Sequence, residues 1–187
     1  ASNTMARILL QQEGVLVNAT NDIGESALHW CHSADAVRLL VEHGAEGLVV
    51  YQESYDRDTY SRLHTAGPKK NFDWRLECPE RAYAGGFRRI GIGALFGLAD
   101  WRHEARALAS HLEYLYKHCW KASFTVSFPR MRPYAGNYQY EPNPDLFLND
   151  RHFVQLVCAF RICFPNLGIV VSTREPANLR DALVPLG

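Results

Sequence analysis

The sequence lacks a net charge, a long apolar run and a signal peptide, and each absence excludes a class of partner or location. Among its 187 residues, 20 Lys and Arg balance 20 Asp and Glu. A chain with this balance has no global attraction to nucleic acid or to an anionic membrane. No apolar stretch is long enough to cross a bilayer, and no secretory signal is present. We therefore expect neither a nucleic-acid partner nor a membrane.

The five cysteines follow no metal-binding or disulfide pattern. Neither a C-x-x-C pair nor a C-x-x-x-C-x-x-C loop occurs, so the sequence encodes no zinc or iron–sulfur nest and no cofactor is expected in this chain. The odd number and wide spacing argue against a disulfide framework and favour a reducing, cytoplasmic location. The spacing supports no Ser–His–Asp or Cys–His arrangement, so no catalytic residue is assigned.

Apolar strands alternate with helices from residue 47 to residue 187. Strands are predicted at 47–53, 89–96, 124–128 and 167–171. Helices are predicted at 76–84, 99–120, 149–163 and 176–183, and loops at 68–74 and 134–144. Such alternation gives parallel strands with right-handed crossovers, and strands this apolar are expected to be covered on both faces. The predicted fold class is α/β: a partial (β/α) barrel with about four parallel strands and covering helices, where a closed (β/α)8 barrel has eight.

Polar residues follow each predicted strand at its carboxyl end, where α/β folds bind ligands. They are Gln52, Glu53, Gly97, Asp100, Arg130, Arg132, Ser172, Thr173, Arg174 and Glu175. If the strands are parallel neighbours, three arginines and two carboxylates meet on one rim. Arginine binds a carboxylate bidentately and glutamate can accept an ammonium, so the set suits a zwitterion such as an amino acid. The alternative is that these arginines and glutamates pair with one another as a structural network.

Two groups of histidines are weaker candidates for a site. His29 and His32, with Asp35, could bind a metal ion. His111 and His118 lie two turns apart on the predicted helix 99–120, and with Glu104 they are expected to form a solvated face.

Residues 1–46 differ from the rest and resemble ankyrin repeats. The resemblance rests on D-x-G-x-S-A-L-H at 22–29 and V-x-L-L-V-x-x-G-A at 37–45, with 5–18 similar to the tail of a preceding repeat. A helix is predicted at 34–43, closed by Gly44 and Ala45. About one and a half units are present, and such repeats need roughly three neighbours to bury their faces. We therefore expect a short all-α ankyrin-like segment at 1–46 that is not self-sufficient, followed by the partial barrel at 47–187.

Residues ~41–187 resemble the later part of 2-iminoacetate synthase, the tyrosine lyase of thiamine thiazole synthesis. The motifs are VYQESY (50–55), GPKKNFDWR (67–75), IGIGALFGLADW (90–101), SFPRMRP (127–133), QLVCAFR (155–161) and STRE (172–175). The family belongs to the radical S-adenosylmethionine enzymes and is related to the hydrogenase-maturation tyrosine lyase. The resemblance implies a (β/α)8-barrel relative whose rim faces tyrosine and S-adenosylmethionine. By motif, the substrate-binding residues would be Glu53, Arg130, Arg132, Ser172, Thr173 and Arg174.

The departure from the family is the missing cluster loop. The family uses S-adenosylmethionine and a four-iron cluster held by C-x-x-x-C-x-x-C, and this loop is absent here. The leading hypothesis is a catalytically inactive fragment or chimera, natural or engineered. The alternatives are a protein-interaction module that uses the ankyrin-like segment and the open sheet edge, or a lyase active only with a cluster-bearing partner. Because an open sheet invites pairing, we expect a homodimer across the seam, another protein partner, or capping by residues 4–46.

Overall fold

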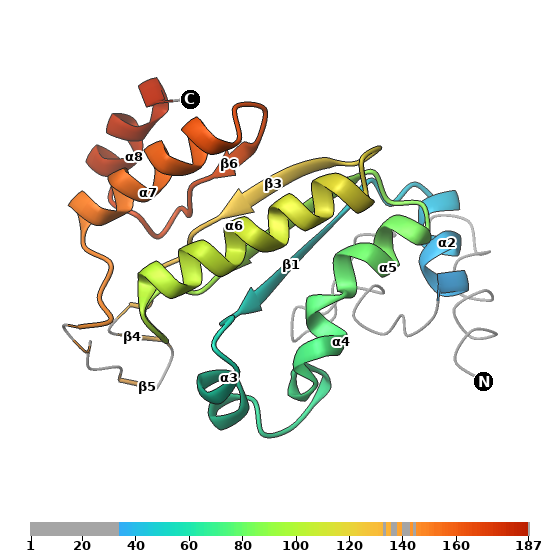
Figure 1. Ribbon diagram of the computed structural model, residues 1–187, viewed down its shortest axis with the longest axis horizontal. Helices are drawn as coiled ribbons and strands as arrows, with labels where there is room; N and C mark the ends of the chain where they lie inside the picture. The colour runs from blue at the N-terminus through green and yellow to red at the C-terminus, as the bar shows by residue number, and fades with distance from the viewer. Residues whose placement is uncertain (1–33, 133, 136–137, 140–142, 144, 187) are drawn as a thin grey trace.

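A single parallel sheet of four strands forms the centre of the fold (Figure 1). The computed structural model describes residues 34–132, 134–135, 138–139, 143 and 145–186. The strands are β1 (Gly47–Glu53), β2 (Arg89–Ala94), β3 (Ser123–Ser127) and β6 (Gly168–Val170). Their order in the sheet is β1-β2-β3-β6, and each neighbouring pair is parallel. The prediction of an α/β fold with four parallel strands is confirmed.

The helices follow the strands in alternation, as predicted. They are α2 (Ala34–Glu42), α3 (Arg57–Leu63), α4 (Phe72–Leu76), α5 (Cys78–Ala84), α6 (Trp101–His118), α7 (Asp150–Cys163) and α8 (Ala177–Leu183), with 3-10 turns η2 (Pro68–Lys70) and η3 (Val184–Leu186). The two long helices begin at side-chain caps: Asp100 accepts from the His103 N–H, and Asn149 accepts from the His152 N–H. None of the described helices is long and apolar enough to cross a membrane.

The main core lies between one face of the sheet and the helices α6 and α7. Ile90, Ile92, Phe124 and Val126 point to this face and are almost completely buried. The helices contribute the other half of the core: Leu108, Leu112, Leu115, Phe153, Leu156, Val157 and Phe160. Burial of this apolar surface is the main force that holds the helices on the sheet.

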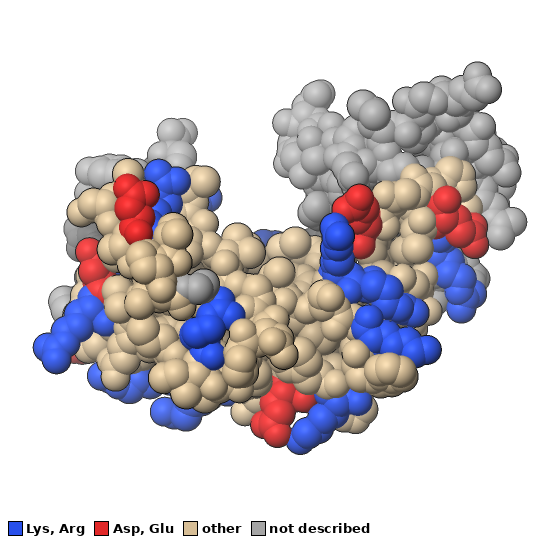
Figure 2. Space-filling view, turned by 90° about the horizontal axis from the view of Figure 1, so that it is seen from above, with Lys and Arg blue, Asp and Glu red and all other residues tan. Residues whose placement is uncertain are grey.

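The opposite face of the sheet is built from small side chains and is uncovered at its edges. A Cβ on Gly91 would lie 2.9 Å from Thr125 Oγ1 and 3.0 Å from Val49 Cγ2, so these residues share that face. Val49 on β1 is 67% exposed and Val170 on β6 is 48% exposed. Figure 2 shows mainly uncharged residues between the charged groups at the two sides of the view. Among the described residues, α6 and α7 cover one face of the sheet, and Val49 and Val170 remain exposed on the other.

Two predicted loops contain regular structure. Within 68–74 the chain forms η2 and the start of α4, because the Asn71 side chain accepts from the Trp74 N–H at 3.0 Å and caps the helix. Within 134–144 a short antiparallel hairpin pairs β4 (Tyr134–Ala135) with β5 (Tyr138–Gln139). The strand predicted at 89–96 ends at Ala94, although Phe96 still forms a parallel bridge with Arg130.

The ankyrin-like prediction lies mostly outside the described residues, which begin at residue 34. The helix predicted at 34–43 is present as α2, and Gly44 ends it with a φ of 92°, the left-handed conformation that glycine adopts easily. Val37 packs with Leu48, Ala82 and Phe87 in a second, smaller apolar cluster. The division into 1–46 and 47–187 stays a prediction, as does the metal reading of His29 and His32.

Candidate functional site

The residues predicted to bind a ligand lie along one rim, at the carboxyl ends of the strands. The arrowheads of β1 and β3 point to this rim in Figure 1. Backbone hydrogen bonds connect it: the Leu95 N–H donates to Glu53 O at 2.7 Å, and the Phe96 N–H donates to Pro129 O at 2.8 Å. At the β6 end, Arg132 Nη2 donates to Arg174 O at 3.1 Å. The rim is therefore continuous from β1 to the segment that follows β6.

Arg130 forms a buried hydrogen-bond network, because its guanidinium is surrounded by acceptors of the protein. Nε donates to Glu175 Oε1 at 3.0 Å, and Nη2 donates to Glu175 Oε2. Nη1 donates to Leu148 O at 2.9 Å and to Asp150 Oδ1 at 2.8 Å, and the group lies over the Phe153 ring. Arg130 thus joins β3 to the start of α7 and to the segment after β6. For Arg130 and Glu175 the alternative of a structural network is the better description.

Arg132 and Arg174 are more open than Arg130. Arg132 Nη2 lies 2.6 Å from Glu175 Oε2, and its side chain is 31% exposed. Its Nε is buried and has no hydrogen-bond partner among the described residues. Arg174 is exposed, and the turn that carries it is fixed by a hydrogen bond from the Arg174 N–H to Ser172 Oγ at 3.2 Å. Thr173 is exposed beside it. These residues form the part of the rim that is accessible to a ligand.

Glu53 lies at the β1 end of the rim in an unusual conformation. Its φ is 72°, the only positive value among the described non-glycine residues. Its Oε1 lies 2.6 Å from Lys69 Nζ and 3.7 Å from Arg75 Nη2. Glu53 is therefore partly neutralised by two cations of the segment 68–76.

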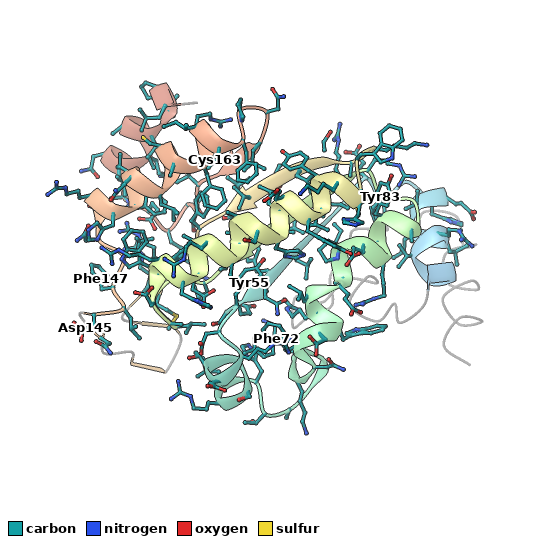
Figure 3. The ribbon with its side chains drawn as sticks, viewed as in Figure 1. Tyr55, Phe72, Tyr83, Asp145, Phe147 and Cys163 are labelled. Carbon is teal, nitrogen blue, oxygen red and sulfur yellow. The ribbon has the colours of Figure 1, made fainter. Side chains whose placement is uncertain are left out.

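The segment 68–76 is held against the end of β1 by side-chain bonds to main-chain oxygens. Arg75 Nε donates to Tyr51 O at 2.7 Å, and Gln52 Nε2 donates to Phe72 O at 3.4 Å. The Tyr60 hydroxyl donates to Lys69 O at 2.5 Å. Figure 3 shows Phe72 beside α3 and α4, below the end of β1. This segment, predicted as a loop, is a fixed wall of the rim.

The prediction of a solvated face at Glu104 and His111 is wrong. Glu104 is completely buried and accepts from Ser54 Oγ at 2.5 Å and from the Tyr55 N–H at 2.8 Å. His111 Nδ1 lies 2.8 Å from the Tyr55 hydroxyl oxygen. Burial raises the pKa of Glu104 and lowers the pKa of His111 to about 4. Only His118, which stacks on the half-exposed Tyr114, lies on the outer side of α6 as expected.

The described residues do not fit an iron–sulfur cluster. The four cysteines within the described part are free and dispersed: Cys78, Cys119, Cys158 and Cys163. The same part contains no group of three or more His, Cys, Asp or Glu placed to hold a metal ion. The rim can provide cations for a carboxylate and one carboxylate for an ammonium, but it does not provide ligands for a metal.

Comparisons with known proteins show what this chain is similar to. Residues 127–187 match the Biotin and Thiamin Synthesis associated domain. The chain is 43% identical over 148 residues to 2-iminoacetate synthase of Escherichia coli (strain K12), covering 79% of this chain and 38% of that protein. It is 41% identical over 144 residues to 2-iminoacetate synthase of Salmonella typhimurium, covering 76% and 37%. The chain spans less than two fifths of the length of these curated relatives.

The chain is also similar to parts of solved structures. The FeFe-hydrogenase maturase HydG from Carboxydothermus hydrogenoformans matches with a TM-score of 0.75 and 41% identity, over 83% of this chain and 35% of that one. A second structure of HydG, a maturase of the [FeFe]-hydrogenase, matches with a TM-score of 0.78 and 27% identity, over 100% of this chain and 41% of that one. The chain is thus homologous to a part of the radical S-adenosylmethionine proteins 2-iminoacetate synthase and HydG, and its open sheet corresponds to a part of their barrel.

Proposed function

We propose that this homologue of a part of 2-iminoacetate synthase binds the carboxylate of an α-amino acid, tyrosine in the first place, at Arg132 and Arg174. We propose further that it performs no radical chemistry by itself. The first proposal rests on the charge balance of the rim, and the second on the missing cluster ligands. Both are proposals for this chain, which spans less than two fifths of the length of its curated relatives.

The surplus of positive charge on the rim carries the binding proposal. Glu175 is a single buried carboxylate shared by Arg130 and Arg132, and Asp150 is the other acid that pairs with Arg130. With Arg174, three guanidiniums on this part of the rim are matched by two carboxylates among the described residues, which leaves a surplus of one positive charge within that set. A guanidinium binds a carboxylate through two parallel N–H···O bonds. A ligand carboxylate between Arg132 and Arg174 would neutralise this surplus.

Glu53 is the proposed acceptor for the ligand ammonium. It lies on β1, two strands from Arg132, which corresponds to about 10 Å between backbones at the usual strand spacing. The long side chains of arginine and glutamate reduce that gap to the size of an amino acid. Ser172 and Thr173 would donate hydroxyl hydrogen bonds to the same carboxylate. S-adenosylmethionine carries the same amino-acid group and is the second candidate ligand.

Calorimetry with two ligands tests the binding proposal. Tyrosine is expected to release heat with the wild-type chain, and Arg174→Ala should weaken binding by roughly 10- to 100-fold, the usual contribution of a hydrogen-bonded charge. The matched control is Arg89→Ala, an exposed arginine at the opposite end of β2 that pairs with Glu46. Titration with S-adenosylmethionine shows which of the two amino acids is preferred. No heat with either ligand at millimolar concentration would end the proposal.

Anaerobic reconstitution with iron and sulfide tests the absence of radical chemistry. Because the described cysteines are dispersed and the sequence has no C-x-x-x-C-x-x-C loop, we expect no stoichiometric cluster absorbance. A fragment or chimera, natural or engineered, would then need a cluster on another chain before tyrosine could be cleaved. A stoichiometric cluster on this chain, with cleavage of tyrosine, would overturn the proposal.

An interaction module is the second candidate function, favoured by the exposed valines on the uncovered face of the sheet. Val49 and Val170 lie on its two edge strands and are 67% and 48% exposed. Exposed apolar side chains on an open sheet favour contact with another chain. A homodimer across the seam is the simplest form of this contact.

A further inference from the structure

The conformation of Glu53 needs a support. A φ of 72° places its backbone in the left-handed region, where the Cβ of a non-glycine residue is crowded and the conformation costs free energy. Such a conformation persists only where surrounding contacts hold it, and it is often found at functional sites. The chain before Glu53 is fixed by the hydrogen bond from Arg75 Nε to Tyr51 O. The residues after it must be fixed by something else.

The support after Glu53 is a buried carboxylate on α6. Glu104 Oε1 accepts from Ser54 Oγ at 2.5 Å, and Oε2 accepts from the Tyr55 N–H at 2.8 Å. Ser54 Oγ in turn accepts from the Asp56 N–H at 3.1 Å. Both Ser54 and Glu104 are 0% exposed, so water cannot replace these bonds. A buried donor that loses its acceptor costs free energy, and the turn is therefore strongly tied to Glu104.

A second bond from the same helix fixes Tyr55. Its hydroxyl oxygen lies 2.8 Å from His111 Nδ1, two helical turns beyond Glu104. Tyr55 is thus attached at its main chain and at the end of its side chain, and Figure 3 shows it between the end of β1 and α6. Because α6 packs on β2 and β3 through the main core, these bonds fix the position of the turn after Glu53 relative to the sheet.

We infer that Glu104 is a positioning residue, which fixes the turn at Ser54 and Tyr55 so that Glu53 presents its carboxylate on the ligand-binding rim. This inference rests on the proposed amino-acid binding, in which Glu53 accepts the ligand ammonium. Glu104 itself is buried beneath the turn and would touch no ligand. Its effect on binding must therefore pass through Glu53.

A substitution series at Glu104 tests this role by calorimetry with tyrosine. Glu104→Met has a similar volume but no acceptor, and we expect tyrosine affinity to fall by roughly tenfold, equivalent to about 1.4 kcal/mol. Glu104→Gln should restore most of the affinity, because its amide oxygen accepts from the Tyr55 N–H while its NH2 donates to Ser54 Oγ. Ser54→Ala, which removes only one of the two bonds, should give an intermediate loss.

The coupling between Glu104 and Glu53 separates positioning from general destabilisation. In a Glu53→Gln background, Glu104→Met should cause no further loss of affinity, because the group it positions is already altered. Cys119→Ala is the matched control, since it removes a buried side chain at the far end of α6 and should lower stability without changing affinity. Equal losses from Glu104→Met in both backgrounds would overturn the inference.

Amide hydrogen exchange tests the positioning without any ligand. The Leu95 N–H donates to Glu53 O, so its exchange rate reports whether the turn keeps its conformation. We expect exchange at Leu95 to rise at least about tenfold in Glu104→Met and to stay near the wild-type rate in Cys119→Ala. Unchanged exchange at Leu95 in Glu104→Met would overturn the inference, whether or not tyrosine binds. A wild-type chain that shows the expected exchange but binds no tyrosine would refute the proposed function alone.

Discussion

At the scale of single residues, the charge of Glu175 holds two arginines. Glu175 is 3% exposed and pairs with Arg130 and Arg132, which both follow β3. Burial raises the pKa of Glu175, but the charges and hydrogen bonds of Arg130 and Arg132 outweigh burial and hold that pKa below its ordinary value. An ion pair in this position is costly to break, because the remaining arginine is left buried without a counter-ion.

Glu175→Gln should lower the free energy of unfolding by about 3 kcal/mol, for that reason. Urea denaturation measures the change. The matched control is Asp150→Asn, which removes the other acidic partner of Arg130; that carboxylate is 68% exposed, so the loss should stay below about 1 kcal/mol. If the two variants were equally stable, Glu175 would not be the carboxylate that holds Arg130.

His111 gives a pH dependence with a definite sign. Burial lowers the pKa of His111 to about 4 in the folded chain, against 6.5 for an unfolded histidine. Its contribution to stability is therefore complete above pH 6.5 and is lost as pH falls toward 4, by at most about 3 kcal/mol. His111→Gln, whose amide can still hydrogen-bond with the Tyr55 hydroxyl, should lose less stability than wild type between pH 6.5 and 4. If His111→Gln and the wild-type chain gave identical profiles, the prediction would be wrong.

At the scale of elements, the close packing of β2 against its neighbours depends on Gly93. A Cβ at this position would lie 2.5 Å from Ser127 O on β3 and 3.0 Å from the Tyr51 ring on β1. A backbone oxygen in a sheet cannot move aside as a flexible side chain can. Gly91 and Gly93 therefore permit the close contact of β2 with its neighbouring strands.

Gly93→Ala should destabilise the chain by about 2–3 kcal/mol, the upper part of the range for overpacked interiors. Gly44→Ala is the control, because its Cβ would meet nothing within 4 Å and only its φ of 92° opposes the change. That variant should cost about 1 kcal/mol. Thermal or urea unfolding of the two variants measures the difference, and a smaller loss for Gly93→Ala than for Gly44→Ala would contradict the steric explanation.

The strands and the long helices could be predicted from the sequence because each carries its own signal. β3, α6 and α7 combine an apolar pattern with a terminal cap or a strand-breaking proline, and β1 carries an apolar run. The positions of all four agree with the predictions to within a few residues. α4 has no such signal. It is a five-residue helix that depends on the Asn71 cap and on bonds to β1, more than fifteen residues away in sequence.

The candidate site could be placed but not resolved from the sequence. The topology alone puts Glu53, Arg132 and Arg174 on one rim, as predicted. It does not reveal that Arg130 forms a buried ion pair with Glu175, because this pair depends on how closely the segment after β6 approaches the end of β3. The burial of Glu104 was not predicted, although this residue falls between Trp101 and Leu108 on the apolar stripe of α6. Its partners at Ser54 and Tyr55 are about fifty residues away, and no local pattern predicts such a contact.

At the scale of the whole molecule, one face of the sheet carries the helices and the other carries small residues between exposed valines. A closed (β/α)8 barrel has twice as many strands as the described sheet, and closure removes both edges. The partner that completes the surface is a matter of proposal: a second copy, another protein or residues 4–46. Each would bury Val49 and Val170.

Val49→Lys should shift the chain toward the monomer if copies pair across the seam, because it places a charge in an apolar contact. Gel filtration with light scattering over a range of concentrations measures the shift. Ile162→Lys is the control, since Ile162 is 78% exposed on α7, on the helical side of the molecule. A compact wild-type monomer that binds no hydrophobic dye would exclude the uncapped dimer and leave capping by residues 4–46.

The strand order of the sheet also governs how the chain can be made. Since β1, β2, β3 and β6 stand side by side in the order of their synthesis, each strand leaving the ribosome finds its hydrogen-bonding template already exposed at the growing edge. No earlier strand has to wait for a distant later one. A nascent chain arrested after β3 should therefore already contain three paired strands. β6 and the buried Glu175 that follows it are then added last.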